Sequence, residues 1–410
     1  VTYGPTGHEY TAASCRVSAS HAQLECVTVP GTGKDHSWLV QIGDQTSALF
    51  GAMTSYSPPI VAYYLGAGST NADTEGGQTV TVMGANFGKD DSKLDRVTYS
   101  SPNGTVFDAQ GCTIVVEHTT IRCTTVPGAG ENLHWVVKVD GQDSEAPSTS
   151  YATPLLTTIT GAGAVDASVY GGQPITLLGD YFGPPDAKTL YGRDFLEAVT
   201  YGEAGTEYRA RECVVISHQE IRCKTAPGVG KDLRWQVTIA GQTSDLSTLT
   251  TNYKAPVINS ISPTHFSTAG GVVVTIDGSN FATFQMPTLL FNGVQQTPSY
   301  TPGEDRLLMT IPEGFGTGIQ IQVVVGGQPS NVRTFDYDPP VITTVNTKAA
   351  ENSTITLIVL GKSFSREPVV TIENDGIQYS VYCPLRTHNQ ITCYTAVAAG
   401  YVTVHTPDGR

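Results

Sequence analysis

The chain has 410 residues, with 43 glycines, 24 prolines and a formal net charge of −14 at pH 7. This length predicts several domains rather than one hydrophobic core. The acidic balance argues against a nucleic-acid-binding protein, which needs a basic face. No run of about 18 apolar residues occurs, so we expect no membrane insertion within residues 1–410.

The chain begins with a partial copy of a unit that then recurs. Val1-Thr2-Tyr3-Gly4 matches Val199-Thr200-Tyr201-Gly202, which lies well inside a later copy. Five domains are expected: 1–57, lacking its first strands; 58–153; 154–254; 255–338, without a disulfide; and 339–410, divergent and lacking its last strand. The links between them run from a Tyr to a Pro, and proline restricts the chain. We therefore expect semi-rigid joints and a rod of domains.

One stretch organises each copy. It runs over 76–88, 171–183 and 270–281 and, in altered form, over 353–364. A glycine pair supplies positive φ for a tight turn. Apolar residues then alternate with threonines, as Val80 and Val82 do. An alternation with a period of two predicts a half-buried strand.

The second half of each copy, except the fourth, carries a cysteine pair. The pairs are Cys15/Cys26, Cys112/Cys123, Cys213/Cys223 and Cys383/Cys393. Matched pairs at similar spacing predict local disulfides and an oxidising compartment. Zinc sites have shorter C-x(2–4)-C pairs, which do not occur here. We therefore predict an extracellular or cell-surface chain.

Other recurrent residues favour structural roles over chemical ones. Histidines precede the second cysteine of each pair: His21, His118, His218 and His388. A metal or pH-sensing array is one hypothesis, but a turn position where His tolerates an unusual φ is favoured. Trp38, Trp135 and Trp235 share a strand face with Val and Ile, so we expect them in the core and not as ligand platforms.

Few candidate sites remain. The acidic loop 89–95 could bind Ca²⁺, but its interspersed lysines favour a solvated loop. Asn103-Gly104-Thr105 and Asn352-Ser353-Thr354 are predicted N-glycosylation sites at turns. No nucleophile elbow, HExxH motif or phosphate-binding loop occurs, so we expect no catalytic residues, no metal, no cofactor and no enzyme activity.

Together these motifs resemble a known family. A proline at the start, Gly-Gly-x-x-(Val/Ile)-Thr-(Val/Leu/Ile)-x-Gly-x-x-Phe, a cysteine pair and Pro-Gly-x-Gly are similar to IPT/TIG domains. Those are immunoglobulin-like modules of plexins, the hepatocyte-growth-factor receptor class, certain transcription factors and many surface proteins. The resemblance implies an all-β chain of tandem immunoglobulin-like β-sandwiches. It does not imply one function, because the module has many roles.

Two incomplete terminal domains would leave open sheet edges, which are templates for assembly. A strand from a neighbouring molecule could fill such an edge. The leading hypothesis is therefore a non-catalytic extracellular structural protein. It would be a subunit of a surface fibre or filament in which copies of the chain meet end to end, 1–57 against 339–410. One alternative is a receptor or adhesin ectodomain segment that binds a protein ligand. Others are spacer repeats of a carbohydrate-active enzyme, or a fragment whose missing strands lie outside the sequence.

Overall fold

The computed structural model of the chain describes residues 1–281, 285–349, 354–397 and 400–407. These residues form two compact units. The first unit comprises 1–161, 174–225 and 234–250, and the second comprises 162–173, 226–233 and 251–410. Below, the first to fifth repeats denote 1–57, 58–153, 154–254, 255–338 and 339–410.

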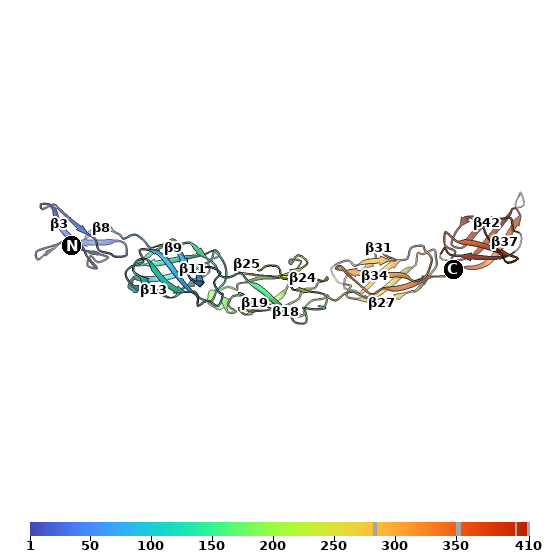
Figure 1. Cartoon of the computed structure of the whole chain (residues 1–410), viewed down its shortest axis with the longest axis horizontal. Helices are drawn as coiled ribbons and strands as arrows, with labels where there is room; N and C mark the ends of the chain where they lie inside the picture. Colours follow the sequence, from blue (N-terminus) through green and yellow to red (C-terminus); the bar gives the residue numbers. More distant parts are fainter. Residues whose placement is uncertain (282–284, 350–353, 398–399, 408–410) are drawn as a thin grey trace. The chain divides into compact units, whose positions relative to one another are not determined.

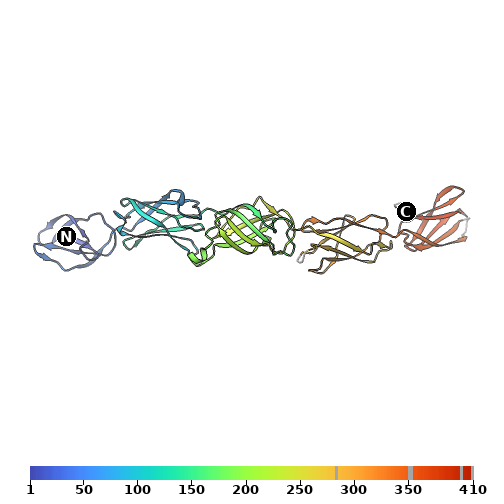
Figure 2. The same cartoon turned by 90° about the horizontal axis from the view of Figure 1, so that it is seen from below.

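The second repeat has two sheets, with strand orders β13-β14-β10-β9 and β12-β11-β15-β16, and β17 also pairs with β15. Its elements are β9 (Ile60–Leu65), η1 (Ala67–Ser69), β10 (Thr79–Ala85), η2 (Asp91–Lys93), β11 (Leu94–Ser100), β12 (Val106–Asp108), β13 (Gln110–Val116), β14 (Thr120–Thr124), β15 (Leu133–Val139), β16 (Gln142–Asp143) and β17 (Ser148–Thr149). Val80 and Val82 are buried between the sheets while Thr79 is exposed. The predicted alternation is confirmed in this strand, and Figures 1 and 2 show the repeat in cyan.

The third repeat follows the same plan, with orders β18-β19-β23-β22 and β21-β20-β24-β25. Its elements are β18 (Leu155–Thr160), β19 (Pro174–Asp180), α1 (Ala187–Tyr191), β20 (Leu196–Gly202), β21 (Tyr208–Arg209), β22 (Arg211–Ser217), β23 (Glu220–Lys224), β24 (Leu233–Ile239), β25 (Gln242–Thr243) and β26 (Thr250–Thr251). The short helix α1 lies between β19 and β20, a segment for which the sequence predicts no helix.

The fourth and fifth repeats lie in the second unit, and each has two sheets. The fourth has orders β27-β29-β33-β32 and β28-β36-β34-β30-β31. Its strands are β27 (Val257–Ser262), β28 (His265–Phe266), β29 (Val273–Ser279), β30 (Thr288–Phe291), β31 (Val294–Gln296), β32 (Ser299–Tyr300), β33 (Arg306–Thr310), β34 (Ile319–Val325), β35 (Gln328–Pro329) and β36 (Arg333–Tyr337). The fifth has orders β37-β38-β42-β41 and β40-β39-β43. Its strands are β37 (Val341–Ala349), β38 (Ile355–Lys362), β39 (Val369–Asn374), β40 (Ile377–Ser380), β41 (Tyr382–Arg386), β42 (Gln390–Thr395) and β43 (Tyr401–His405).

The first repeat has one four-stranded sheet, β2-β1-β5-β8, and two ribbons, β3-β4 and β6-β7. Its strands are β1 (Thr2–Gly4), β2 (Tyr10–Thr11), β3 (Ala13–Ala19), β4 (Gln23–Val27), β5 (His36–Leu39), β6 (Gln41–Ile42), β7 (Gln45–Thr46) and β8 (Phe50–Thr54). Trp135 and Trp235 are buried as predicted, but Trp38 is only half-buried. The prediction for Trp38 is therefore wrong, because within the described residues β5 has no facing sheet comparable to β13-β14-β10-β9 of the second repeat.

The glycine within the recurrent strand has a steric cause. A Cβ added at Gly84 would lie 1.9 Å from the carbonyl oxygen of Ile60 and 2.6 Å from the Phe87 ring. The pairing of β9 with β10 shifts register just at this glycine. The same positions in later repeats, Gly179, Gly278 and Gly361, would place a Cβ 1.8, 2.3 and 2.0 Å from the carbonyl oxygens of Leu155, Val257 and Val341. Only glycine at this position lets the first strand of each repeat pass so close to the strand that holds the glycine.

Each cysteine pair forms a disulfide between the two strands of a hairpin, and no cysteine is free. The bonds are Cys15–Cys26, Cys112–Cys123, Cys213–Cys223 and Cys383–Cys393, with Cα–Cα distances of 4.1, 4.1, 4.1 and 3.9 Å. In the second repeat the bond ties the sheet-edge strand β13 to β14, whose Cys123 is completely buried. The hairpin tip between the two cysteines is thereby held in shape.

Candidate functional site

The described residues contain no set of three or more His, Cys, Asp or Glu side chains placed to hold a metal ion. In the same part of the chain, no helix has the length and apolar character to cross a membrane. The features that recur are polar contacts at the ends of the repeats. We call the contact regions between consecutive repeats junctions and number them from the first. The contacts given below for the first two junctions lie in the first unit, and those for the third and fourth lie in the second unit.

A tyrosine closes each of the first four repeats. The backbone N–H of this tyrosine donates to the carbonyl of the second glycine in the Pro-Gly-x-Gly loop, or of the equivalent glycine in the fourth repeat. The tyrosine hydroxyl donates to a second backbone carbonyl, which lies just before that loop. The N–H bonds run from Tyr56, Tyr151, Tyr253 and Tyr337 to the carbonyls of Gly33, Gly130, Gly230 and Gly316, all at 2.9 Å. The hydroxyl bonds run to the carbonyls of Val29, Val126, Ala226 and Pro312. The Tyr before each link, which the sequence shows without a role, therefore anchors the end of its repeat.

The loop glycines make room for this tyrosine. An added Cβ would approach the tyrosine side chain to 2.7, 2.6, 2.3 and 2.6 Å at Gly31, Gly128, Gly228 and Gly314. Burial raises the pKa of Tyr151 well above its ordinary value and that of Tyr337 to about 12. Both hydroxyls therefore remain protonated at physiological pH and can donate.

In the second repeat these bonds close into a ring. The Val126 N–H donates to the Tyr99 hydroxyl at 3.0 Å, which donates to the Tyr151 hydroxyl at 2.7 Å. Tyr151 in turn donates to the Val126 carbonyl at 2.6 Å. The first repeat has the same ring, built from Val29, Tyr3 and Tyr56. Every polar atom of the ring thus has a partner, and in the second repeat both tyrosines are almost completely buried.

Replacing Tyr151 with Phe should destabilise the second repeat by about 1–3 kcal/mol, because one buried and one half-buried group lose a partner. These are the Tyr99 hydroxyl and the Val126 carbonyl. Hydrogen exchange of the β15 amides measures the effect. Tyr63→Phe is the control, since Tyr63 is 51 % exposed. Equal exchange in the two variants would contradict the proposed ring.

A glutamine from the next repeat reaches each closing tyrosine at three junctions. Its Nε2 donates to the tyrosine backbone carbonyl: Gln142 to Tyr56 at 3.1 Å, Gln242 to Tyr151 at 3.0 Å and Gln328 to Tyr253 at 3.1 Å. Each glutamine directly follows a glycine-containing hairpin turn. At the first junction the turn itself also contacts the preceding loop, because Thr32 Oγ1 donates to Asp140 Oδ2 at 3.0 Å.

A histidine makes a second type of contact at two junctions. Thr74 Oγ1 lies 2.9 Å from His218 Nδ1 at the second junction, and Thr268 Oγ1 lies 2.8 Å from His388 Nδ1 at the fourth. Both threonines have no exposed surface. Each threonine lies just before the glycine pair of its repeat. Each histidine lies at the tip of the disulfide-bonded hairpin of the following repeat.

The turn interpretation of the histidines is thus only half right. His21 and His118 have left-handed backbone conformations, with φ of 58° and 63°, as a turn position allows. His218 and His388 have a further role as contact residues between repeats. Sequence reasoning missed it, although the recurrence of Thr before the glycine pair was a usable signal.

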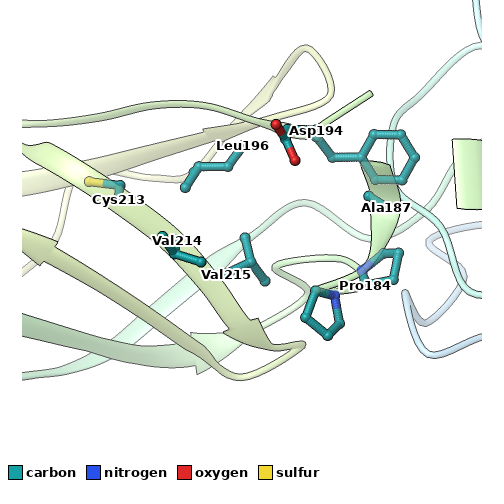
Figure 3. A pocket seen from close by; sticks show the side chains of 9 residues that line it. Pro184, Ala187, Asp194, Leu196, Cys213, Val214 and Val215 are labelled. Atoms are coloured by element: carbon teal, nitrogen blue, oxygen red, sulfur yellow. The ribbon is translucent and has the colours of Figure 1, made fainter. Parts of the chain in front are cut away.

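The second junction has additional contacts from the segment around α1. The Tyr191 ring packs edge-on against Phe107 with centroids 4.9 Å apart, and its hydroxyl donates to the Pro127 carbonyl. Gln219 Nε2 donates to Glu75 Oε1 at 2.7 Å. A cavity of about 190 Å³ lies beside this segment (Figure 3) and is lined mainly by apolar side chains, among them Pro184, Leu196, Val214 and Val215. The segment around α1 thus adds an aromatic contact and two hydrogen bonds to this junction.

Of the two predicted N-glycosylation sites, the structure describes only the one at Asn103. Asn103 is exposed, and its Oδ1 accepts hydrogen bonds from the Thr105 hydroxyl at 3.1 Å and from the Ser101 hydroxyl at 2.5 Å. Its side-chain nitrogen carries none of these bonds. Asn352 lies outside the described residues. Both sites therefore stay predictions.

The fold defines a class of protein: a chain of tandem immunoglobulin-like β-sandwiches, as the sequence predicts. The family model for the IPT/TIG domain matches residues 67–153 and 256–337. These two segments are IPT/TIG domains, the non-catalytic immunoglobulin-like modules that the motifs indicate. The four disulfides are typical of oxidising surroundings, and the chain is an extracellular or cell-surface protein.

Several solved structures match the chain at low identity and low TM-score. The plexin A4 extracellular region is 12% identical over 83% of this chain and 34% of that chain, with a TM-score of 0.23. SGBP-B from a xyloglucan utilization locus of Bacteroides uniformis is 12% identical over 59% and 86%, with a TM-score of 0.20. The Escherichia coli adhesin FdeC is 15% identical over 68% and 99%, with a TM-score of 0.19. This chain spans about a third of the plexin A4 region, and identities and TM-scores this low say nothing about its function.

Proposed function

We propose that the chain is a non-catalytic structural protein of an extracellular surface and forms a fibre by end-to-end contact between copies. The main support is an apolar surface on the first repeat that is exposed within the described residues. Val17 on β3 is 65 % exposed and Ile42 on β6 is 70 % exposed. Together with Leu24 and Val40 they line a cavity of about 670 Å³. An exposed apolar patch of this kind marks an interaction surface.

The later repeats indicate what such a surface accepts. In the second repeat β14 pairs with β13 on one side and with β10 on the other. In the first repeat the equivalent strand β4 pairs with β3 only, within the described residues. A strand with alternating apolar residues, laid against the free edge of β4, would bury Leu24, which is now 39 % exposed. Strand addition of this kind gives affinity through main-chain hydrogen bonds.

The proposal commits to a second copy of this chain as the partner, with its fifth repeat against the first. Contacts of this head-to-tail type do not close and give filaments. Sedimentation velocity and negative-stain electron microscopy of the chain test it: oligomers should grow with concentration. Val17→Lys should abolish them, because a charge would enter the contact.

Val165→Lys is the matched control, since Val165 is 69 % exposed in the third repeat and should leave assembly unchanged. A chain that stays monomeric at millimolar concentration contradicts the fibre. That result would favour a receptor or adhesin ectodomain segment instead. Assembly that Val17→Lys does not alter would show that copies meet through another surface.

Glycosylation at Asn103 is proposed with this function. We expect the chain from a eukaryotic secretory host to lose mass on enzymatic release of N-glycans. Asn103→Gln should remove that loss at this site, as should Thr105→Ala, because the acceptor motif needs the hydroxyl residue. Peptide mapping that finds Asn103 unmodified in the secreted chain would contradict the prediction.

A further inference from the structure

The Thr74–His218 contact has a chemistry that depends on protonation. Thr74 is completely buried, and its hydroxyl needs a partner because an unpaired buried hydroxyl is costly. A neutral imidazole has one nitrogen that accepts and one that donates. His218 Nδ1, 2.9 Å away, can therefore accept the Thr74 hydroxyl proton. In the protonated ring both nitrogens donate, so Nδ1–H would donate to Thr74 Oγ1 and the buried hydroxyl proton would be left without this acceptor.

The surroundings of His218 hold charges of one sign. The carboxylates of Glu75, Asp73 and Asp186 favour a positive ring, but burial at the junction opposes it and is the larger effect. The net result is a pKa for His218 below its ordinary value. Glu75 is itself engaged by the Gln219 side chain, which follows His218 on the hairpin tip.

We propose that the hairpin tip of the third repeat is a proton-operated latch on the second repeat. Neutral His218 closes the latch by accepting the Thr74 hydroxyl, and protonation opens it. The tip is held in shape by the Cys213–Cys223 disulfide, which brackets the histidine. The proposed fibre needs this junction only as a structural element, and the latch adds a pH response to it. The latch proposal therefore does not depend on whether copies of the chain assemble.

The direction of the response follows from linkage. An undocked histidine titrates near 6.5, and the docked one titrates lower. Well above pH 6.5 both states are neutral, so docking is at full strength. As the pH falls below that value the undocked tip binds a proton first, and docking weakens by up to ~tenfold per pH unit until the docked histidine also titrates.

The fourth junction provides an internal contrast. His388 makes the same contact with Thr268, but its Nε2 lies 3.6 Å from Glu313 Oε2. Glu313 is also paired with Arg366 at 2.9 Å. Thr268 Oγ1 accepts a second bond from the Ser365 N–H at 3.3 Å. Because Thr268 Oγ1 has this second partner and a carboxylate lies beside the His388 ring, this contact depends less on the histidine than the one at the second junction does.

Hydrogen exchange of the whole chain, compared at pH 7.5 and 5.5 after correction for intrinsic rates, tests the latch. We expect amides near Thr74 and His218 to lose protection several-fold at the lower pH, while those near Thr268 keep theirs. His218→Gln keeps a side-chain acceptor that does not titrate, so its protection should be the same at both pH values. His118→Asn is the matched control, because His118 sits on the equivalent tip without this contact, and it should respond as the unaltered chain does.

A second readout is imidazole NMR, in which His218 should titrate below 6.5. Protection near Thr74 that does not change with pH would overturn the proposal, as would an unchanged response in His218→Gln. A His218 titration at or above 6.5 in the folded chain would do the same. If His218→Gln loosens the junction at every pH, the side chain is a contact residue without a switch, and the proposal is equally wrong.

Discussion

Replacing Gly179 with alanine is expected to unfold the third repeat locally while the second stays folded. The new Cβ would lie 1.8 Å from the Leu155 carbonyl oxygen and 2.8 Å from the Phe182 ring. Neither can yield easily, because β18 is paired along its length with β19 and Phe182 is completely buried. We expect a loss of about 3 kcal/mol, the upper end for overpacking a core.

Hydrogen exchange resolved by segment measures this loss, with protection falling in β19 and β23 but not in β10 and β14. Gly172→Ala is the matched control: its φ is +79° but nothing lies within 4 Å of an added Cβ. Its cost should be about 1 kcal/mol, from backbone conformation alone. If the two substitutions destabilise the repeat equally, close approach of the strands is not the reason for Gly179.

Replacing Trp135 with alanine should cost the second repeat about 3–5 kcal/mol, the range for removing a buried aromatic side chain. Trp135 is 1 % exposed and stacks on Tyr99 with centroids 4.6 Å apart. Its Nε1 donates to the Thr149 hydroxyl at 2.8 Å, and that acceptor would be left buried. Denaturant unfolding followed by segment-resolved hydrogen exchange gives the change.

Trp38→Ala in the first repeat tests how much of the stability loss comes from burial of the indole and how much from its stacking and hydrogen bond. Trp38 stacks on Tyr3 at 4.4 Å and donates to the Thr54 hydroxyl at 3.0 Å, so its partners match those of Trp135. It is only half-buried, however, and less apolar area returns to water. We expect a clearly smaller loss than for Trp135→Ala. Equal losses would mean that stacking and the hydrogen bond, not burial, dominate.

Local patterns explain why much of the fold was predictable. Val80 and Val82 alternate with threonines because one face of β10 is buried, and such alternation is visible in any single repeat. The same pattern recurs in later repeats, which strengthened the prediction of a strand at this position. The cysteine pairs were equally readable, since each bond joins neighbouring strands of one hairpin. Helix α1 was missed because five residues are too few for a helical period to show.

The junction contacts were not predictable by the same means. Thr74 and His218 are 144 residues apart, and each has an ordinary local setting. Their meeting depends on how one repeat follows the next, which no periodicity within a repeat encodes. The contact between Gln142 and Tyr56 differs, because an equivalent glutamine and an equivalent tyrosine occur at the same positions of later repeats. A comparison of the repeats could therefore have predicted this contact. Trp38 shows the opposite error, since the pattern of its strand does not reveal how much of the second sheet is present.

The closing tyrosine has a mechanical consequence. Tyr151 ends the second repeat, and tension along the backbone from the following link reaches it before any core strand. Its N–H and hydroxyl are tied to the Gly130 and Val126 carbonyls, and its own carbonyl accepts Gln242. A pulling force applied through the link would therefore load these three bonds before it reaches the sheets. Tyr56, Tyr151 and Tyr253, whose carbonyls all accept a glutamine of the next repeat, should thus share the load between a repeat and its successor.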